Sequence, residues 1–296
     1  TKGKGSFVNH LDALVESGYI ERPKTAESPG TAIGLILAVM KTKIDHELFD
    51  HIEYYARQFG YHLIVKISRE SQSIETESIR ELRSFGVEGM ILFPTENELY
   101  NSEILKLAVD NFPLVFVDRY LPGISASSIT TDNYHITKTA ILDMRKRGAK
   151  NIAFLSPDSK NSVTIDRLDG FYDAFSGHSD EVSQIHKLMI DLEVKERQQK
   201  EAIIRDFIAA NPTIDGFFCV NHELATLLLG VLEKHFPDLI ANRLLYAFDA
   251  SDLPHFTSIH QATPTISKLA VDTLHELIEH RGAHRQLTVP AEIRYK

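Results

Sequence analysis

The sequence has a single cysteine and no excess of basic residues, and each shortage excludes a class of protein. The lone Cys219 excludes an intramolecular disulfide and a zinc site built from cysteines. It lies in the apolar run GFFCV, which is typical of a buried thiol rather than a nucleophile. The net charge of −9 argues against a DNA-binding surface formed by most of the chain, because DNA affinity depends on clustered lysine and arginine.

Other signatures are missing as well. No apolar run approaches the roughly 18–20 residues that span a membrane, and no signal peptide is visible. The fourteen histidines show no H-x-x-H or H-E-x-x-H spacing, so we expect no metal site. No G-x-G-x-x-G follows a predicted strand and no G-x-S-x-G occurs, so we expect neither a dinucleotide cofactor nor a serine nucleophile.

Short apolar runs recur at regular intervals along the chain. They are residues 33–39, 62–67, 89–93 and 114–118, then, after a pause near SITTDNY (128–134), residues 151–156, 185–190, 216–220 and 244–249. Nearly continuous apolar runs predict parallel strands that are covered on both faces. Helical patterns lie between them; apolar side chains from Leu48 to Phe59 share one face of a helix expected to end at Gly60.

This alternation of strands and helices predicts an α/β fold with parallel sheets. Two groups of four units favour two similar lobes, although one large doubly wound sheet would give the same spacing. In open parallel sheets, ligands bind beyond the carboxyl ends of the strands. The residues that follow the predicted strands are rich in hydrogen-bonding groups; they are residues 41–45, 94–95, 118–119, 156–162, 221–222 and 249–250.

From about Thr31 to its end, the chain resembles the effector-binding domain of the lactose-repressor/galactose-repressor (LacI/GalR) family. The resemblance is carried, in this order, by FDHIEYYARQFGYHLIV, VEGMILFP, PLVFVDR, DRLDGFYDAF, IDGFFCVN and LLYAFD. It implies a type I periplasmic-binding-protein-like fold with a ligand cleft between two lobes. The N-terminal lobe would comprise residues 31–130 and 262–286, and the C-terminal lobe residues 131–261 and 287–296. The resemblance also implies a homodimer.

The first eight residues, TKGKGSFV, resemble the wing of a gluconate-repressor (GntR) type winged helix. Glycines permit a tight hairpin turn, and Lys2 and Lys4 could reach DNA phosphates. We therefore expect residues 1–8 to be the remnant of a DNA-binding domain and residues 9–30 to be a linker, in an arabinose-repressor-like architecture. The alternative is a stub without structure, and LDALVESGYI (11–20), which resembles the end of a recognition helix, leaves the order of these parts open.

The resemblance also implies which side chains contact the effector. Arg167 in DRLDGF would donate hydrogen bonds to hydroxyls or a carboxylate, and Asp249 in AFD would accept them from hydroxyls. The alternatives are an exposed helix arginine and a helix N-cap. The further candidates are Asn221, Asp118, Asn161, Gln261, His222, Lys43 and Asp45.

Two of these positions depart from the family pattern. His222 stands where the family usually has aspartate, and Lys43-Ile44-Asp45 stand where it commonly has Asn-Pro-Phe. His222 and Lys43 would suit an anionic ligand; alternatively, His222 is structural and Lys43 is a solvated surface lysine.

Together these features predict a ligand-responsive transcriptional repressor of a carbohydrate-utilisation operon. It would act in the cytoplasm, bind a sugar or sugar derivative between its lobes, and bind operator DNA through its N-terminal domain, without a cofactor or membrane contact. The alternative is a periplasmic or lipoprotein sugar-binding protein of an ABC importer, which shares the fold. An enzyme is the least favoured class, because no nucleophile, metal or cofactor motif stands out.

Overall fold

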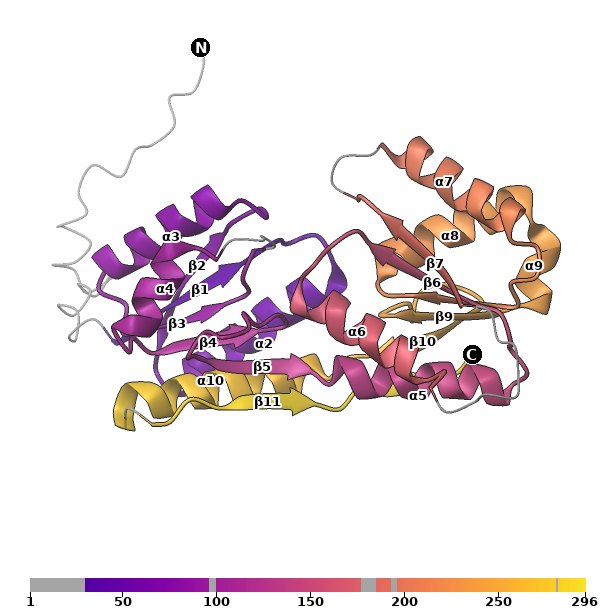
Figure 1. Cartoon of the computed structure of the whole chain (residues 1–296). Helices are drawn as coiled ribbons and strands as arrows, with labels where there is room; N and C mark the ends of the chain where they lie inside the picture. Colours follow the sequence, from indigo (N-terminus) through magenta and orange to yellow (C-terminus); the bar gives the residue numbers. More distant parts are fainter. Residues whose placement is uncertain (1–29, 96–99, 177–184, 193–195, 281) are drawn as a thin grey trace, which may run out of the picture.

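The computed structural model describes residues 30–95, 100–176, 185–192, 196–280 and 282–296, which form two α/β lobes (Figure 1). Each lobe contains one six-stranded sheet, so the expected two-lobed fold is confirmed and a single large sheet is excluded. The expected wing remnant (1–8), with Lys2 and Lys4, and residues 9–29 of the expected linker lie outside the described residues.

The first lobe has an all-parallel sheet of order β11-β5-β4-β3-β1-β2. Its strands are β1 Ala32–Leu37, β2 His62–Ile67, β3 Gly89–Leu92, β4 Leu114–Val117, β5 Ser127–Thr131 and β11 Gln286–Val289. Its helices are α2 Lys43–Gln58, α3 Gln72–Ser84, α4 Ser102–Val109 and α10 Thr263–His280. Both sheet faces are covered: Leu35 packs in a core cluster with α2 and α10, whereas Ile36 packs in another with α3 and α4.

The second lobe repeats this plan with the order β12-β10-β9-β8-β6-β7, in which only the short edge strand β12 is antiparallel. Its strands are β6 Ile152–Pro157, β7 Ile185–Ile190, β8 Gly216–Cys219, β9 Leu244–Phe248, β10 Phe256–His260 and β12 Glu292–Arg294. Its helices are α5 Asn133–Lys146, α6 Ser162–Asp173, α7 Arg197–Ala210, α8 His222–His235 and α9 Pro237–Asn242. Cys219 is fully buried in this core, and burial raises the pKa of its thiol, which confirms a structural cysteine.

The chain crosses between the lobes three times: after β5, after β10 and between β11 and β12. The third crossing lies at residues 290–291 rather than after residue 286 as expected. Residues 286–289 belong to the first lobe because β11 pairs in parallel with β5 over four positions. The first crossing is also one residue later than expected, since β5 continues to Thr131.

Strand β5 lies where the sequence predicted only a pause. Its side chains, SSITT, are all buried although four of the five are polar. The hydroxyls have partners that the sequence could not reveal: Ser127 Oγ accepts from the N–H of Arg285 at 3.1 Å, and Thr131 Oγ1 donates to Gln261 Oε1 at 2.6 Å. A buried strand can therefore lack an apolar run when tertiary partners satisfy its polar atoms.

Among the described residues, no helix is long and apolar enough to cross a membrane. The same residues contain no group of three or more His, Cys, Asp or Glu side chains that could hold a metal ion.

Two helical glycines of the second lobe provide a test of the packing. A Cβ added to Gly170 in α6 would lie 2.3 Å from the carbonyl oxygen of Tyr134 in α5. We expect Gly170→Ala to lower the free energy of unfolding by about 1–3 kcal/mol, because the helices must move apart. Urea unfolding of the purified variant measures this change.

The matched control is Gly230→Ala in α8. There the nearest heavy atom to an added Cβ, Nη2 of Arg197, is 3.9 Å away. The same substitution should raise the free energy of unfolding by about 0.5–1 kcal/mol through helix propensity. Equal effects at the two positions would contradict the close α5–α6 contact.

Candidate ligand-binding site

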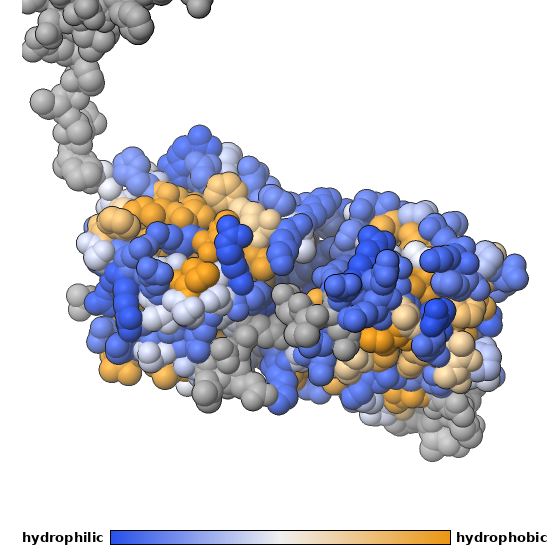
Figure 2. All heavy atoms as spheres, turned by 90° about the horizontal axis from the view of Figure 1, so that it is seen from above, coloured by the Kyte–Doolittle hydropathy of each residue, from blue (hydrophilic) through white to orange (hydrophobic). Residues whose placement is uncertain are grey.

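Two aspartates occupy equivalent positions in the two lobes, whose surface is hollowed between them (Figure 2). Asp118 follows β4 and Asp249 follows β9, and their N–H groups donate to Ile129 and Ile259 carbonyls at 3.2 and 2.9 Å. Both adopt a left-handed backbone conformation, with φ of 63° and 58°. This conformation is uncommon for residues other than glycine and is concentrated at functional sites, so its recurrence marks both positions as candidates.

Arg167 is held in α6 by three parts of the second lobe. Its Nε donates to Asn133 Oδ1 at 2.8 Å, and its Nη1 donates to the carbonyl of Val220. The guanidinium carbon lies 3.4 Å from the ring centroid of Phe248. The residue is only 5% exposed, which excludes the alternative of an exposed helix arginine.

The charge of Arg167 depends on the carboxylates around it. Burial lowers its pKa to about 10, although Asp249, Asp118 and Asp166 favour the protonated form. The guanidinium therefore stays charged at neutral pH. Because Asp118 belongs to the first lobe, this electrostatic contact joins the two lobes.

Asp249 is positioned by residues at two of the chain crossings. Thr131 Oγ1 donates to Gln261 Oε1 at 2.6 Å, and Gln261 Nε2 donates to Asp249 Oδ2 at 2.7 Å. The other oxygen, Oδ1, is buried and has no hydrogen-bond partner among the described residues. No helix follows Asp249, so it is not an N-cap. A buried acceptor without a hydrogen-bond donor lowers the stability of the fold, and a ligand hydroxyl could donate to it.

The pKa of both aspartates is raised. Burial raises the pKa of Asp249 to about 6, against the opposing effects of Arg167 and the Gln261 hydrogen bond. Burial also raises the pKa of Asp118, against the opposing effects of Arg119 and Arg167. The charge of Asp118 also raises the pKa of Asp249, and buried carboxyls with perturbed pKa values are typical of functional sites. We refer to Asp118, Arg167, Asp249 and Gln261 as the interlobe site.

Three other predicted ligand residues cap helices. Asn161 and Asn221 accept from the N–H groups of Thr164 and Leu224, each at 2.9 Å, at the starts of α6 and α8. Asp45 closes a capping box at the start of α2, where its Oδ2 accepts from the N–H of Thr42 at 2.7 Å. The structure thus gives each a structural role, and Asp45 also raises the pKa of Asp118 through its charge.

The two residues that favoured an anionic ligand pair with carboxylates outside the interlobe site. His222 Nε2 is 3.0 Å from both carboxylate oxygens of Asp252. The side chain of Lys43 is 64% exposed and lies 3.5 Å from Glu47. Neither makes a recorded hydrogen bond or ion pair to the interlobe site within the described part of the chain.

The sequence analysis missed an ion pair beside Asp118. Arg119 Nη2 lies 2.9 Å from Glu70 Oε1, and its Nη1 donates to Glu70 Oε2 at 3.2 Å and to the carbonyl of Pro94 at 3.1 Å. Arg119 also lies over the ring of Phe93, 4.8 Å from its centroid. The dipeptide Asp118-Arg119 was visible after a predicted strand, but nothing local points to Glu70, which is 49 residues away.

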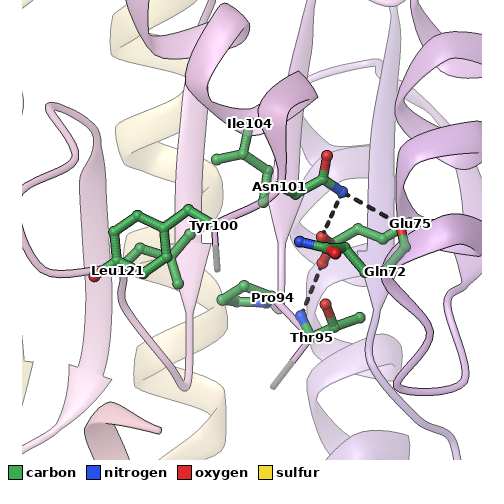
Figure 3. A pocket seen from close by; sticks show the side chains of 8 residues that line it. All are labelled: Gln72, Glu75, Pro94, Thr95, Tyr100, Asn101, Ile104 and Leu121. Atoms are coloured by element: carbon green, nitrogen blue, oxygen red, sulfur yellow. Dashed lines mark hydrogen bonds between the residues drawn. The ribbon is translucent and has the colours of Figure 1, made fainter. Parts of the chain in front are cut away.

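A small pocket in the first lobe is lined by eight residues (Figure 3). One of them is Pro94, whose carbonyl accepts from Arg119. Another is Glu75, which is 1% exposed and accepts from Thr95 N–H and from Asn101 Nδ2, both at 2.8 Å. Burial raises the pKa of Glu75, and these hydrogen bonds oppose the rise. Both carboxylate oxygens are engaged, so Glu75 fixes the end of β3 and the start of α4 rather than offering a ligand site.

The loop after β4 also contacts the second lobe directly. The N–H of Tyr120 donates to Ser162 Oγ at 2.9 Å, and its hydroxyl donates to Asp166 Oδ1 at 3.1 Å. Burial and the neighbouring Asp166 raise the pKa of Tyr120 to about 12, so the hydroxyl remains a donor. These contacts hold the lobes together beside the interlobe site.

The fold is that of a two-lobed α/β protein in which charged side chains of both lobes influence one another. A sequence profile described as "Periplasmic binding proteins and sugar binding domain of LacI family" matches residues 30–236. The chain therefore belongs to this family, as the resemblance implied.

Individual relatives agree with this assignment. The transcriptional regulator KdgR of Bacillus subtilis is 24% identical over 272 residues, covering 88% of this chain and 78% of that protein. The arabinose metabolism transcriptional repressor of Geobacillus stearothermophilus is 26% identical over 285 residues, covering 90% of this chain and 76% of that protein. A ribose import binding protein of Bacillus subtilis is 20% identical over 273 residues, covering 88% and 86%.

Solved structures show the same fold. A LacI transcriptional regulator from Lactobacillus brevis matches with a TM-score of 0.77 at 17% identity, covering 89% of this chain and 100% of that chain. Two of the three relatives described above are named as transcriptional regulators and one as an import binding protein, which favours a transcriptional regulator over an importer's binding protein.

The raised pKa of Asp249 predicts how stability depends on pH. Because the folded state binds this proton more tightly than the unfolded state, the contribution of Asp249 to stability is present below about pH 4 and is lost as pH rises toward 6. An asparagine has no titrating carboxyl, so the Asp249→Asn variant does not lose this contribution to stability as the pH rises. We expect the variant to gain roughly 2 kcal/mol relative to the unmodified protein between pH 4 and 7, measured by urea unfolding at each pH.

Asp252→Asn provides the matched control. Burial favours a higher pKa for Asp252, but the hydrogen bond and charge of His222 outweigh it, so the pKa is lowered. The trend with pH should therefore be small and opposite in sign. A flat difference for Asp249→Asn across this range would contradict the buried, unsatisfied carboxylate.

Proposed function

We propose that this protein is a ligand-responsive transcriptional repressor of a carbohydrate-utilisation operon. The residues that the structure describes would be mainly its effector-binding and dimerisation region. The observation that carries the proposal is the interlobe site, in which a fixed guanidinium lies beside two aspartates from different lobes, one with an unfilled buried oxygen. One relative is named as a transcriptional regulator and another as an arabinose metabolism transcriptional repressor, and both support the regulatory role.

A small polyol is the ligand class that this chemistry favours. Asp249 Oδ1 would accept one hydroxyl, Asp118 another, and Arg167 would donate to a ligand oxygen. A ligand that contacts Asp118 and Asp249 together requires both lobes, so it would bind the closed arrangement more tightly than an open one. It could shift that equilibrium only by this difference in affinity.

DNA binding is proposed for a different part of the protein. TKGKGSFV resembles the end of a winged-helix domain, and Lys2 and Lys4 would contact operator phosphates. Closure of the lobes would change how two copies pack in a homodimer and thereby reorient their DNA-binding domains. On this proposal the protein acts in the cytoplasm, needs no cofactor and catalyses no reaction.

The second candidate is the sugar-binding protein of an importer, supported by the ribose import relative and the shared fold. An electrophoretic mobility shift of the full-length protein on the promoter of the neighbouring carbohydrate genes separates the two. A regulator retards this DNA, and the sugar that stabilises the protein changes the retardation. An importer protein binds the sugar but not the DNA.

The effector assignment is tested by a thermal-shift screen of neutral sugars, sugar acids and sugar phosphates, followed by Arg167→Ala. A ligand at about 100 times its Kd stabilises the native state by about 2.7 kcal/mol. We expect Arg167→Ala to weaken binding of the stabilising sugar about 10- to 100-fold, because a charged donor is lost. Isothermal titration measures the affinity.

Arg145→Ala is the matched control for this variant. Arg145 donates to the carbonyl of Ala174 at 2.8 Å and lies 5.1 Å from the ring centroid of Phe175, so it makes the same kinds of contact as Arg167. It lies outside the interlobe site, and its loss should leave ligand affinity unchanged. Retained affinity in Arg167→Ala would refute the assigned site.

A further inference from the structure

The ion pair between Glu70 and Arg119 determines which charge a ligand of the interlobe site can carry. Arg119 is adjacent to Asp118, whose pKa responds to Arg119 and also to Glu70. Arg119 is thus a first-lobe cation whose charge acts on a carboxyl of the interlobe site. A guanidinium there would be a natural partner for a phosphate or carboxylate group.

Glu70 already pairs with this guanidinium. Both of its oxygens contact Arg119, at 2.9 and 3.2 Å, and the carbonyl of Pro94 takes a further N–H. The two charged side chains are only 14% and 18% exposed. In this weakly solvated position, an anionic ligand would have to displace a carboxylate or lie beside it, and both are costly.

The positive charge of Arg167 in the interlobe site does not offset this cost. Arg167 already interacts electrostatically with Asp118 and Asp249, and both aspartates favour its charged form. A further anion would be repelled by Asp118 and Asp249. Uncharged hydroxyls avoid this repulsion and supply the donors that Asp249 Oδ1 lacks.

We propose that the interlobe site selects an uncharged polyol over its phosphorylated or oxidised counterparts, and that Glu70 enforces this selection by neutralising Arg119. The inference rests on the proposed function, in which a sugar-like effector binds between the lobes. Glu70 is then a specificity-determining residue that contacts Arg119 rather than the ligand.

The first test compares neutral sugars with their charged counterparts on the unmodified protein. The ligands are D-ribose, D-glucose, D-fructose and L-arabinose, each at 10 mM, against ribose 5-phosphate, glucose 6-phosphate, fructose 1-phosphate and gluconate. We expect stabilisation by a neutral sugar and at least tenfold weaker binding of its charged counterpart. Tighter binding of a charged ligand overturns this inference but leaves the proposed regulator intact. No response to any ligand overturns both the sugar assignment and this inference.

The second test is Glu70→Gln, which removes the carboxylate that binds Arg119 and leaves the guanidinium charged. We expect at least a tenfold gain in affinity for the phosphorylated counterpart of the stabilising sugar, and less than a threefold change for the sugar itself. Glu53→Gln is the matched control, because Glu53 pairs with Arg57 at 3.2 Å on the exposed surface of α2 and the substitution changes net charge equally. A gain in both variants, or in neither, overturns the role of Glu70. The comparison on the unmodified protein stands even where Glu70→Gln does not fold.

Discussion

Burial of the Arg167 guanidinium is the constraint on which the interlobe site depends. A buried charge is costly unless polar groups surround it. Here α5 supplies an amide oxygen, the residue after β8 a backbone carbonyl, and β9 an aromatic face. Asp249 and Asp118 then favour the charged form from both lobes. One side chain thereby fixes the relative positions of elements that are far apart in the sequence.

The two lobes have matching aspartates but different surroundings. Asp249 accepts a hydrogen bond from Gln261 and has one carboxylate oxygen without a partner among the described residues, whereas Asp118 lies beside the Glu70–Arg119 ion pair. The second lobe therefore supplies a fixed arginine, and the first lobe supplies a carboxyl beside an arginine that is already paired. On the proposed function, this asymmetry would favour uncharged ligands that contact both lobes.

The same hydrogen bonds connect the site to the chain crossings. Thr131 ends β5 at the first crossing and Gln261 precedes α10 at the second, and both belong to the chain of bonds that ends on Asp249. A ligand that bonds to Asp249 would therefore contact a chain of hydrogen bonds that includes residues at two of the crossings. The contact of Tyr120 with Ser162 and Asp166 adds a direct link between the lobes.

The sequence by itself determined the eight core strands, the end of α2 before Gly60 and the α/β class, because strands buried on both faces leave a local apolar run. The structure decided between two lobes and one large sheet. It also singled out Arg167 and Asp249. Only the tertiary structure decided that polar β5 is a strand, that Asn161, Asn221 and Asp45 cap helices, and that Glu70 neutralises Arg119. The physical reason is that a strand buried on both faces is visible in the sequence as a run of neighbouring apolar residues, whereas the role of a polar side chain depends on the group to which it bonds. These groups come from other strands and from the other lobe, and no local sequence pattern indicates them.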